Sequence, residues 1–268
     1  ARGTNVAAPA EGQFLVVAND GPGLEAITSK TELENKVSGS ALLWQGANPG
    51  GCDRFLMSSA SASTLTAGHK GTEEDPFLVH VDLTRLAARI DFCNKYSNDT
   101  KTAAYGTYSV KRPSSETVSV SGFKYDIEGT GLYFLLESIT PFNLYNESEY
   151  LFRRVQDAWT GTPTTTVLGA ETTTNYVVDP KTSQKESSTL NYINPLGDTE
   201  PDTWSTAAGH RTAESLNSGR RSGISYVVAY AMENTLLPDS PLKSYATGLV
   251  VHGSYYDSTD KEISRKTF

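Results

Sequence analysis

Cysteine, methionine and histidine are scarce in this chain, which has 268 residues but only two, two and four of them. Cys52 and Cys93 form none of the closely spaced pairs of zinc or redox sites, so two free thiols and one disulfide both remain open. The histidines form no H-E-x-x-H frame, and no G-x-S-x-G nucleophile motif occurs. We therefore expect neither an enzyme nor a cofactor site.

Long apolar runs and an excess of basic residues are missing too. No stretch approaches the 18 or more apolar residues of a membrane span. The formal net charge of −8 gives no basic footprint, so nucleic acid is not an expected partner. Because no leader-like stretch opens the chain, we expect residue 1 to be a processed N-terminus.

Tyrosine, threonine and valine are common instead, which favours β structure. Short apolar segments are separated by turn-rich loops, a pattern typical of β-sandwiches. The length suits two domains, and a change of composition places their boundary near residue 147. The sequence therefore predicts an all-β protein with few short helices, divided into residues 1–147 and 148–268.

The longest periodic stretch in the first half covers residues 79–92. Val79, Val81 and Leu83 alternate with polar neighbours, and the alternation resumes out of phase at Leu86 and Ile90. A continuous strand would need a bulge near residues 84–85 to absorb this slip. A helix is the alternative, because the apolar spacing also fits one helical face.

Other segments are expected to form short elements. Further strands are predicted at residues 14–18, 40–44, 55–57, 105–111, 117–120, 131–140, 176–180, 225–232 and 246–256, and short helices at residues 31–37, 150–159 and 212–217.

Few residues qualify as recognition or ligand-binding candidates. Trp204 lies in a long polar region and is the best candidate for an exposed recognition residue. His210 follows several acidic residues that could bind a metal, although a solvated loop is the simpler interpretation. The acidic cluster at residues 73–75 lacks EF-hand spacing, so we expect a solvated loop there as well.

Five segments, in order, resemble the fimbrillins of Bacteroidales type V pili (FimA/Mfa-type subunits), with the minor-fimbrium subunits the most similar in character. They are residues 83–92 (LTRLAARIDF), 138–143 (SITPFN), 176–180 (YVVDP), 230–235 (YAMENT) and 247–256 (TGLVVHGSYY).

This resemblance implies two tandem transthyretin-like β-sandwiches in a structural, accessory or tip subunit of a cell-surface fimbria. It implies export as a lipoprotein precursor, indirect attachment to the outer membrane, and maturation by cleavage after a basic residue, for which Arg2 is the candidate. Cleavage opens a groove that a strand from the next subunit fills, head to tail. Other fimbrial subunits are thus the expected partners, and host glycans or proteins are further candidates.

We expect the assembly groove in the first sandwich. Its candidate residues are Phe14, Leu15, Val16, Val17, Leu83, Leu86 and Ile90. The family's usual C-terminal donor-strand pattern is absent, so the second domain is expected to be incomplete. The alternative function is a surface carbohydrate-binding or adhesive module that does not polymerise.

Overall fold

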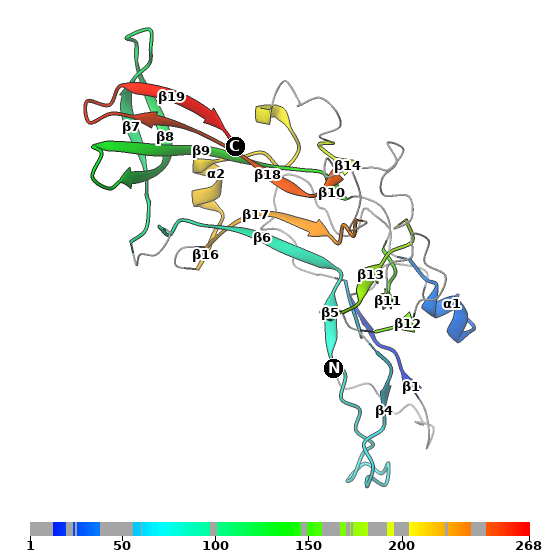
Figure 1. Ribbon diagram of the computed structural model, residues 1–268. Coiled ribbons are helices and arrows are strands. Elements are labelled where there is room, and N and C mark those ends of the chain that lie inside the picture. Colours follow the sequence, from blue (N-terminus) through cyan, green and yellow to red (C-terminus); the bar gives the residue numbers. More distant parts are fainter. Residues whose placement is uncertain are drawn as a thin grey trace.

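The computed structural model describes residues 13–19, 24, 26–37, 56–59, 61–96, 101–145, 149–156, 167–169, 172, 174–181, 192–195, 204–222, 225–236 and 245–268. Most elements in these residues are β-strands and only two are short α-helices (Figure 1). The predicted all-β class with few short helices is confirmed.

The larger sheet has six antiparallel strands in the order β19-β18-β9-β8-β7, with β15 beside β9. The long strand β9 organises it, because β18 pairs along one side while β8 and β15 share the other. The strands are β7 (Ala104–Lys111), β8 (Thr117–Ile127), β9 (Leu132–Phe142), β15 (Arg211–Thr212), β18 (Gly248–Tyr256) and β19 (Glu262–Thr267).

A smaller sheet lies against the larger one, below it in Figure 1. Its three strands are β16 (Arg220–Ser222), β17 (Ser225–Met232) and β6 (Ala87–Cys93), in the order β16-β17-β6. All residues of β17 after the first are buried, which suits its continuous apolar sequence at the centre of the sheet.

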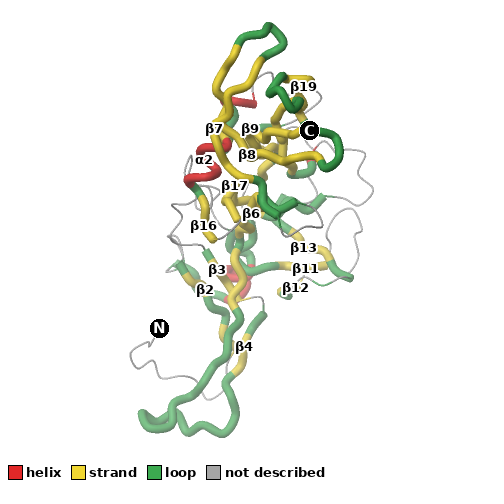
Figure 2. The backbone as a smooth tube through the Cα atoms, turned by 90° about the vertical axis from the view of Figure 1, so that its left-hand side faces the viewer, coloured by secondary structure: helices red, strands yellow, loops and turns green. Residues whose placement is uncertain are grey.

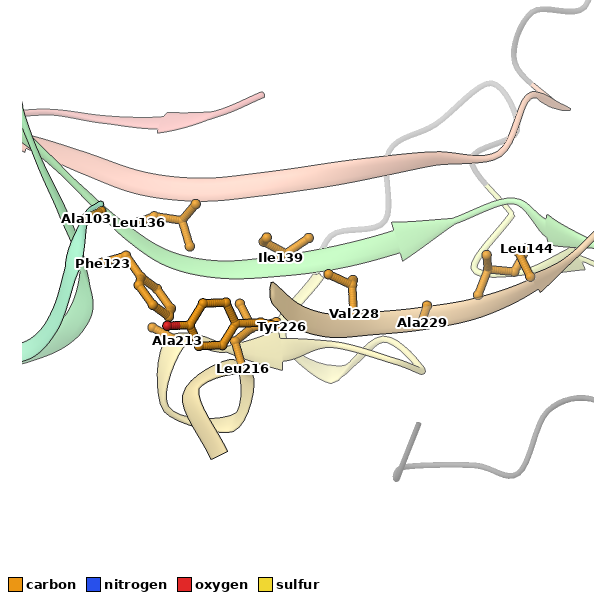
Figure 3. Close-up of a cluster of buried hydrophobic side chains, with 11 residues drawn as sticks. Ala103, Phe123, Leu136, Ile139, Leu144, Ala213, Leu216, Tyr226, Val228 and Ala229 are labelled. Carbon is orange, nitrogen blue, oxygen red and sulfur yellow. The ribbon is translucent and has the colours of Figure 1, made fainter. Parts of the chain in front are cut away.

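The main core fills the space between the two sheets (Figure 3). Phe123 of β8 and Tyr226 of β17 meet edge to face, with their ring centroids 5.1 Å apart. Such a contact between aromatic rings adds to the gain from burial. The buried members of this cluster are Ala103, Phe123, Leu136, Ile139, Leu144, Ala213, Leu216, Tyr226, Val228, Ala229 and Ala231.

The helix α2 (Ala213–Ser218) closes one side of this core. Its N-terminus is capped by Thr212, whose Oγ1 accepts a hydrogen bond from the Ser215 amide at 3.1 Å. Ala213 and Leu216 are fully buried in the core cluster. The helix predicted at residues 212–217 is therefore confirmed.

A second cluster lies beside the smaller sheet and joins residues from the first third of the chain to later ones. It contains Leu56, Ala87, Tyr145, Leu151, Phe152, Tyr192 and Met232. The remaining elements of the described chain are β1 (Gln13–Phe14), β2 (Val17–Ala18), α1 (Lys30–Glu34), β3 (Met57–Ser59), β4 (Ser63–Thr64), β5 (Leu83–Arg85), β10 (Leu144–Tyr145), β11 (Arg154–Gln156), β12 (Val167–Leu168), β13 (Tyr176–Val178), β14 (Tyr192–Ile193) and a short 3₁₀ helix (Trp204–Thr206).

The continuous bulged strand predicted for residues 79–92 is only partly correct, because the stretch forms two short strands in different sheets. β5 ends at Arg85 and β6 begins at Ala87, so the helix alternative is wrong. At the break, the Leu86 amide donates to the Leu56 carbonyl at 3.2 Å. Leu86 packs against the second cluster, whereas Ile90 packs against the main core. The slip therefore marks the transfer of the chain from one core to the other.

Other sequence predictions have mixed outcomes. The strands at residues 105–111, 225–232 and 246–256 and the helix at residues 31–37 are confirmed within a few residues. Residues 14–18 form two separate short strands, and β11 replaces part of the helix predicted at residues 150–159. The strand predicted at residues 40–44 lies outside the described residues.

The predicted boundary near residue 147 lies between strands that share sheets. β6 precedes it and pairs with β17, and β9 precedes it and pairs with β18. Strand pairing therefore provides no division of the chain at this position, and the tandem arrangement of two sandwiches stays a prediction.

Candidate assembly edge and a histidine-lined hollow

The predicted groove residues separate into two environments. Leu15, Val17 and Leu86 pack against the second cluster, and Phe14 is half-buried in β1. Ile90 instead packs against the main core. The structure therefore brings together only some of the groove residues predicted from the sequence.

The segment that contains Val16 is hydrogen-bonded to β3. The Val16 amide donates to Ser59 Oγ at 3.0 Å, and the Val16 carbonyl accepts from the Ser59 amide at 2.9 Å. Beside Leu86 lies a small cavity of about 30 Å³, lined also by Ser58 and Thr84. A cavity of this size holds about one water molecule and no strand. Leu83 lies nearby with 39 % of its surface exposed.

The strand β6 has one free edge in the described part of the chain. β17 pairs with it from Ala87 to Cys93, and no described strand pairs with its other side. Ile90 and Phe92 are half-buried and pack against the main core next to this edge. An edge of this kind presents unpaired N–H and C=O groups together with apolar surface.

Charged side chains also occupy this edge strand. Arg89 donates from Nε and Nη2 to the two carboxylate oxygens of Asp91, both at 2.8 Å. This pairing raises the pKa of Arg89. Cys93, at the end of the strand, is exposed and forms no disulfide, while Cys52 lies outside the described residues. An exposed ion pair on an edge strand discourages indiscriminate pairing.

At one end of the larger sheet, the end of β7 contacts the turn between β18 and β19. The Lys111 amide at the end of β7 donates to the Asp260 carbonyl at 2.8 Å, in the turn between β18 and β19. Arg112 and Glu262 form an ion pair there at 2.5 Å. Tyr133 donates its hydroxyl to Asp260 at 2.8 Å, and burial together with this hydrogen bond raises the pKa of Tyr133.

Trp204 is buried, so the prediction of an exposed recognition residue is wrong. Only 7 % of its surface is accessible. It lies in a short 3₁₀ helix, and its ring packs near Phe142, with the centroids 6.1 Å apart. Its carbonyl accepts from Thr140 Oγ1 at 3.4 Å. A tryptophan buried in this way presents no open face for stacking on a ligand.

A hollow of about 430 Å³ opens beside Trp204 on the outer face of the larger sheet. His210 and His252 line it, and so do Glu137 and Arg265. His210 Nδ1 lies 2.7 Å from Thr140 Oγ1. Burial, with a smaller effect from the neighbouring His252, lowers the pKa of His210. A lowered pKa favours the neutral form of this half-buried imidazole.

The acidic cluster at residues 73–75 lies in the loop between β4 and β5, which projects away from the rest of the protein (Figure 2). Asp75 accepts from the Lys70 amide at 3.1 Å and contacts His69 Nδ1 at 2.7 Å. The contact with His69 lowers the pKa of Asp75. Within the described part of the chain, no three His, Cys, Asp or Glu side chains form a metal site.

Two features of these sites were not predicted from the sequence. Nothing linked His210 to His252, because 41 residues separate them and only the sheet brings them together. The strand β19 was not predicted, since its sequence EISRKT has a single large apolar residue, Ile263. Arg2 lies outside the described residues.

Comparison with known proteins identifies no relative. No family model matches the chain, and no curated protein or solved structure matches it either. Among the described residues, no helix is long and apolar enough to span a membrane.

Proposed function

We propose that this protein is a structural or accessory subunit of a bacterial surface fibre, joined to its neighbours by strand addition. The free edge of β6 is the observation that carries this proposal. A strand from another subunit would satisfy the unpaired backbone groups of β6, and its alternate side chains could cover Ile90 and Phe92. Such contacts, repeated head to tail, generate an open fibre and not a closed ring.

The five sequence segments that resemble fimbrillins support the same proposal. One of them, residues 83–92, contains all but the last residue of the edge strand β6. By this resemblance we also propose fimbrial localisation at the outer surface, export as a lipoprotein precursor, and maturation cleavage near Arg2. The alternative of a carbohydrate-binding module depended on an exposed Trp204, so its burial removes the observation that favoured it.

A spin label on Cys93 tests the proposal, because this exposed thiol marks the end of β6. The label is attached to the full chain carrying Cys52→Ser. The matched control carries Ser114→Cys in place of both native cysteines, and residue 114 lies in the exposed turn after β7. As the protein associates at rising concentration, we expect the spectrum to broaden at residue 93 and to stay sharp at residue 114.

Two results would count against strand addition at β6. One is association that leaves the label at residue 93 as mobile as in the monomer. The other is a chain that remains monomeric at every concentration, as followed by light scattering.

A further inference from the structure

The sheet brings His210 and His252 to one face although they come from different strands. His252 on β18 pairs with Ser138 of β9, and Ser138 pairs with Thr212 of β15. Alternate residues along a strand share a face, which places His210 on the same side as Thr212. The contact between His210 and Thr140 agrees, since Thr140 shares a face with Ser138.

Each imidazole is held at Nδ1 by a threonine hydroxyl. The Thr140 hydroxyl lies 3.4 Å from the Trp204 carbonyl and 2.7 Å from His210 Nδ1, and when it donates to the carbonyl its oxygen accepts the proton of Nδ1. In that tautomer His210 Nε2 carries a lone pair. His252 Nδ1 lies 3.0 Å from Thr267 Oγ1. A hydrogen bond at one ring nitrogen fixes the orientation of the other, as in the outer shell of metal sites.

The remaining nitrogens are available for a ligand. His252 Nε2 is buried and has no hydrogen-bond partner in the described residues. Glu137, which lines the same hollow, accepts from Ser254 Oγ at 2.9 Å and lies 3.8 Å from Arg265. Imidazole nitrogens and a carboxylate are donors suited to zinc and copper.

We propose that this hollow binds one divalent transition-metal ion, through Nε2 of His210 and of His252. Because no three ligating side chains converge in the described residues, Glu137 would turn from Ser254 toward the ion, and water would complete the coordination. The ion would connect β18 to the segment that precedes β15. This site is separate from the edge of β6, so it stands or falls independently of the fibre proposal.

Calorimetric titration with ZnCl₂ tests the site in the full chain without an affinity tag, after removal of metal by a chelator. We expect one equivalent to bind and affinity to fall at least about tenfold in either His210→Gln or His252→Gln. The matched controls are His69→Gln and His80→Gln, whose imidazoles contact Asp75 and Asp82 in the loop between β4 and β5. These two control variants should bind Zn²⁺ with the same affinity as the unaltered protein.

Copper provides a second readout that does not depend on affinity. With one equivalent of Cu²⁺, the electron paramagnetic resonance spectrum of the unaltered protein should show coupling to two imidazole nitrogens. The spectrum of His210→Gln or of His252→Gln, the two hollow variants, should show coupling to one. Thermal unfolding in chelator confirms that the variants fold. The proposal is overturned if no equivalent binds, if both hollow variants bind as the unaltered protein does, or if the loop variants lose the site.

Discussion

The two ends of this sandwich are finished differently. At one end, β7 meets the turn between β18 and β19, and Arg112 pairs with Glu262. At the other, the smaller sheet stops at β6, whose outer side has no partner strand in the described residues. The chain thus links one boundary through a backbone bridge and an ion pair, and at the other leaves an unpaired strand edge beside half-buried apolar side chains. This difference is why we place assembly at β6.

The largest expected effect comes from the core that both ends share. Phe123→Ala removes a fully buried ring that contacts Phe92 and Tyr226, with centroids 5.2 and 5.1 Å away. We expect a loss of about 3–5 kcal/mol in the free energy of unfolding. Urea denaturation measures it. A loss below about 1 kcal/mol would mean that the two sheets do not depend on this contact.

The ion pairs at the two ends provide the next comparison. Arg112→Met leaves the Glu262 carboxylate, only 7 % exposed, without its closest partner, and should cost about 1–3 kcal/mol. Arg89→Met removes an exposed pair beside the open edge and should cost at most about 1 kcal/mol. Denaturant titration of both variants checks the ranking, and equal losses would refute the distinction between a closed and an open end.

A pH titration examines the outer face of the larger sheet. Burial lowers the pKa of His210, so the folded protein resists protonation there more than the unfolded chain does. Above the ordinary histidine pKa, near 6.5, the contribution of this group to the free energy of unfolding is fully present. As the pH falls below 6.5, the unfolded chain takes up the proton more readily, so the free energy of unfolding decreases by no more than about 1.4 kcal/mol per pH unit. His210→Gln should flatten unfolding free energies measured between pH 7.5 and 5.5. An unchanged slope would show that this imidazole is not responsible.

The smallest effect is expected on β19. Ile263→Ser changes a side chain with 54 % of its surface exposed, so the free energy of unfolding should move by no more than about 0.5 kcal/mol. Thermal unfolding measures this. A larger loss would indicate that the outer side of β19 is covered in solution.

Local patterns in the sequence predicted the elements that depend on neighbouring residues. The continuous apolar run of β17 and the capped start of α2 needed no information from elsewhere in the chain. The break at Leu86 was visible as a change of phase, because each core demands its own face of the strand. Prediction succeeded where the cause lies within a few residues.

Long-range pairing explains what the sequence could not show. Trp204 lies in a polar region, but its burial depends on Thr140 and Phe142, more than 60 positions earlier. The hollow likewise requires β18 and β15 on opposite sides of β9. No spacing in the sequence encodes these pairings, which is why the exposed recognition residue was a wrong prediction.

Hydrogen exchange, followed by mass spectrometry in the monomer and in the associated protein, tests assembly at β6 most directly. Amides in a free edge exchange quickly and become protected when a strand is added. The account predicts new protection in peptides covering residues 87–93, with little change in residues 104–111 of β7. Protection at β7 with none at β6 would contradict it.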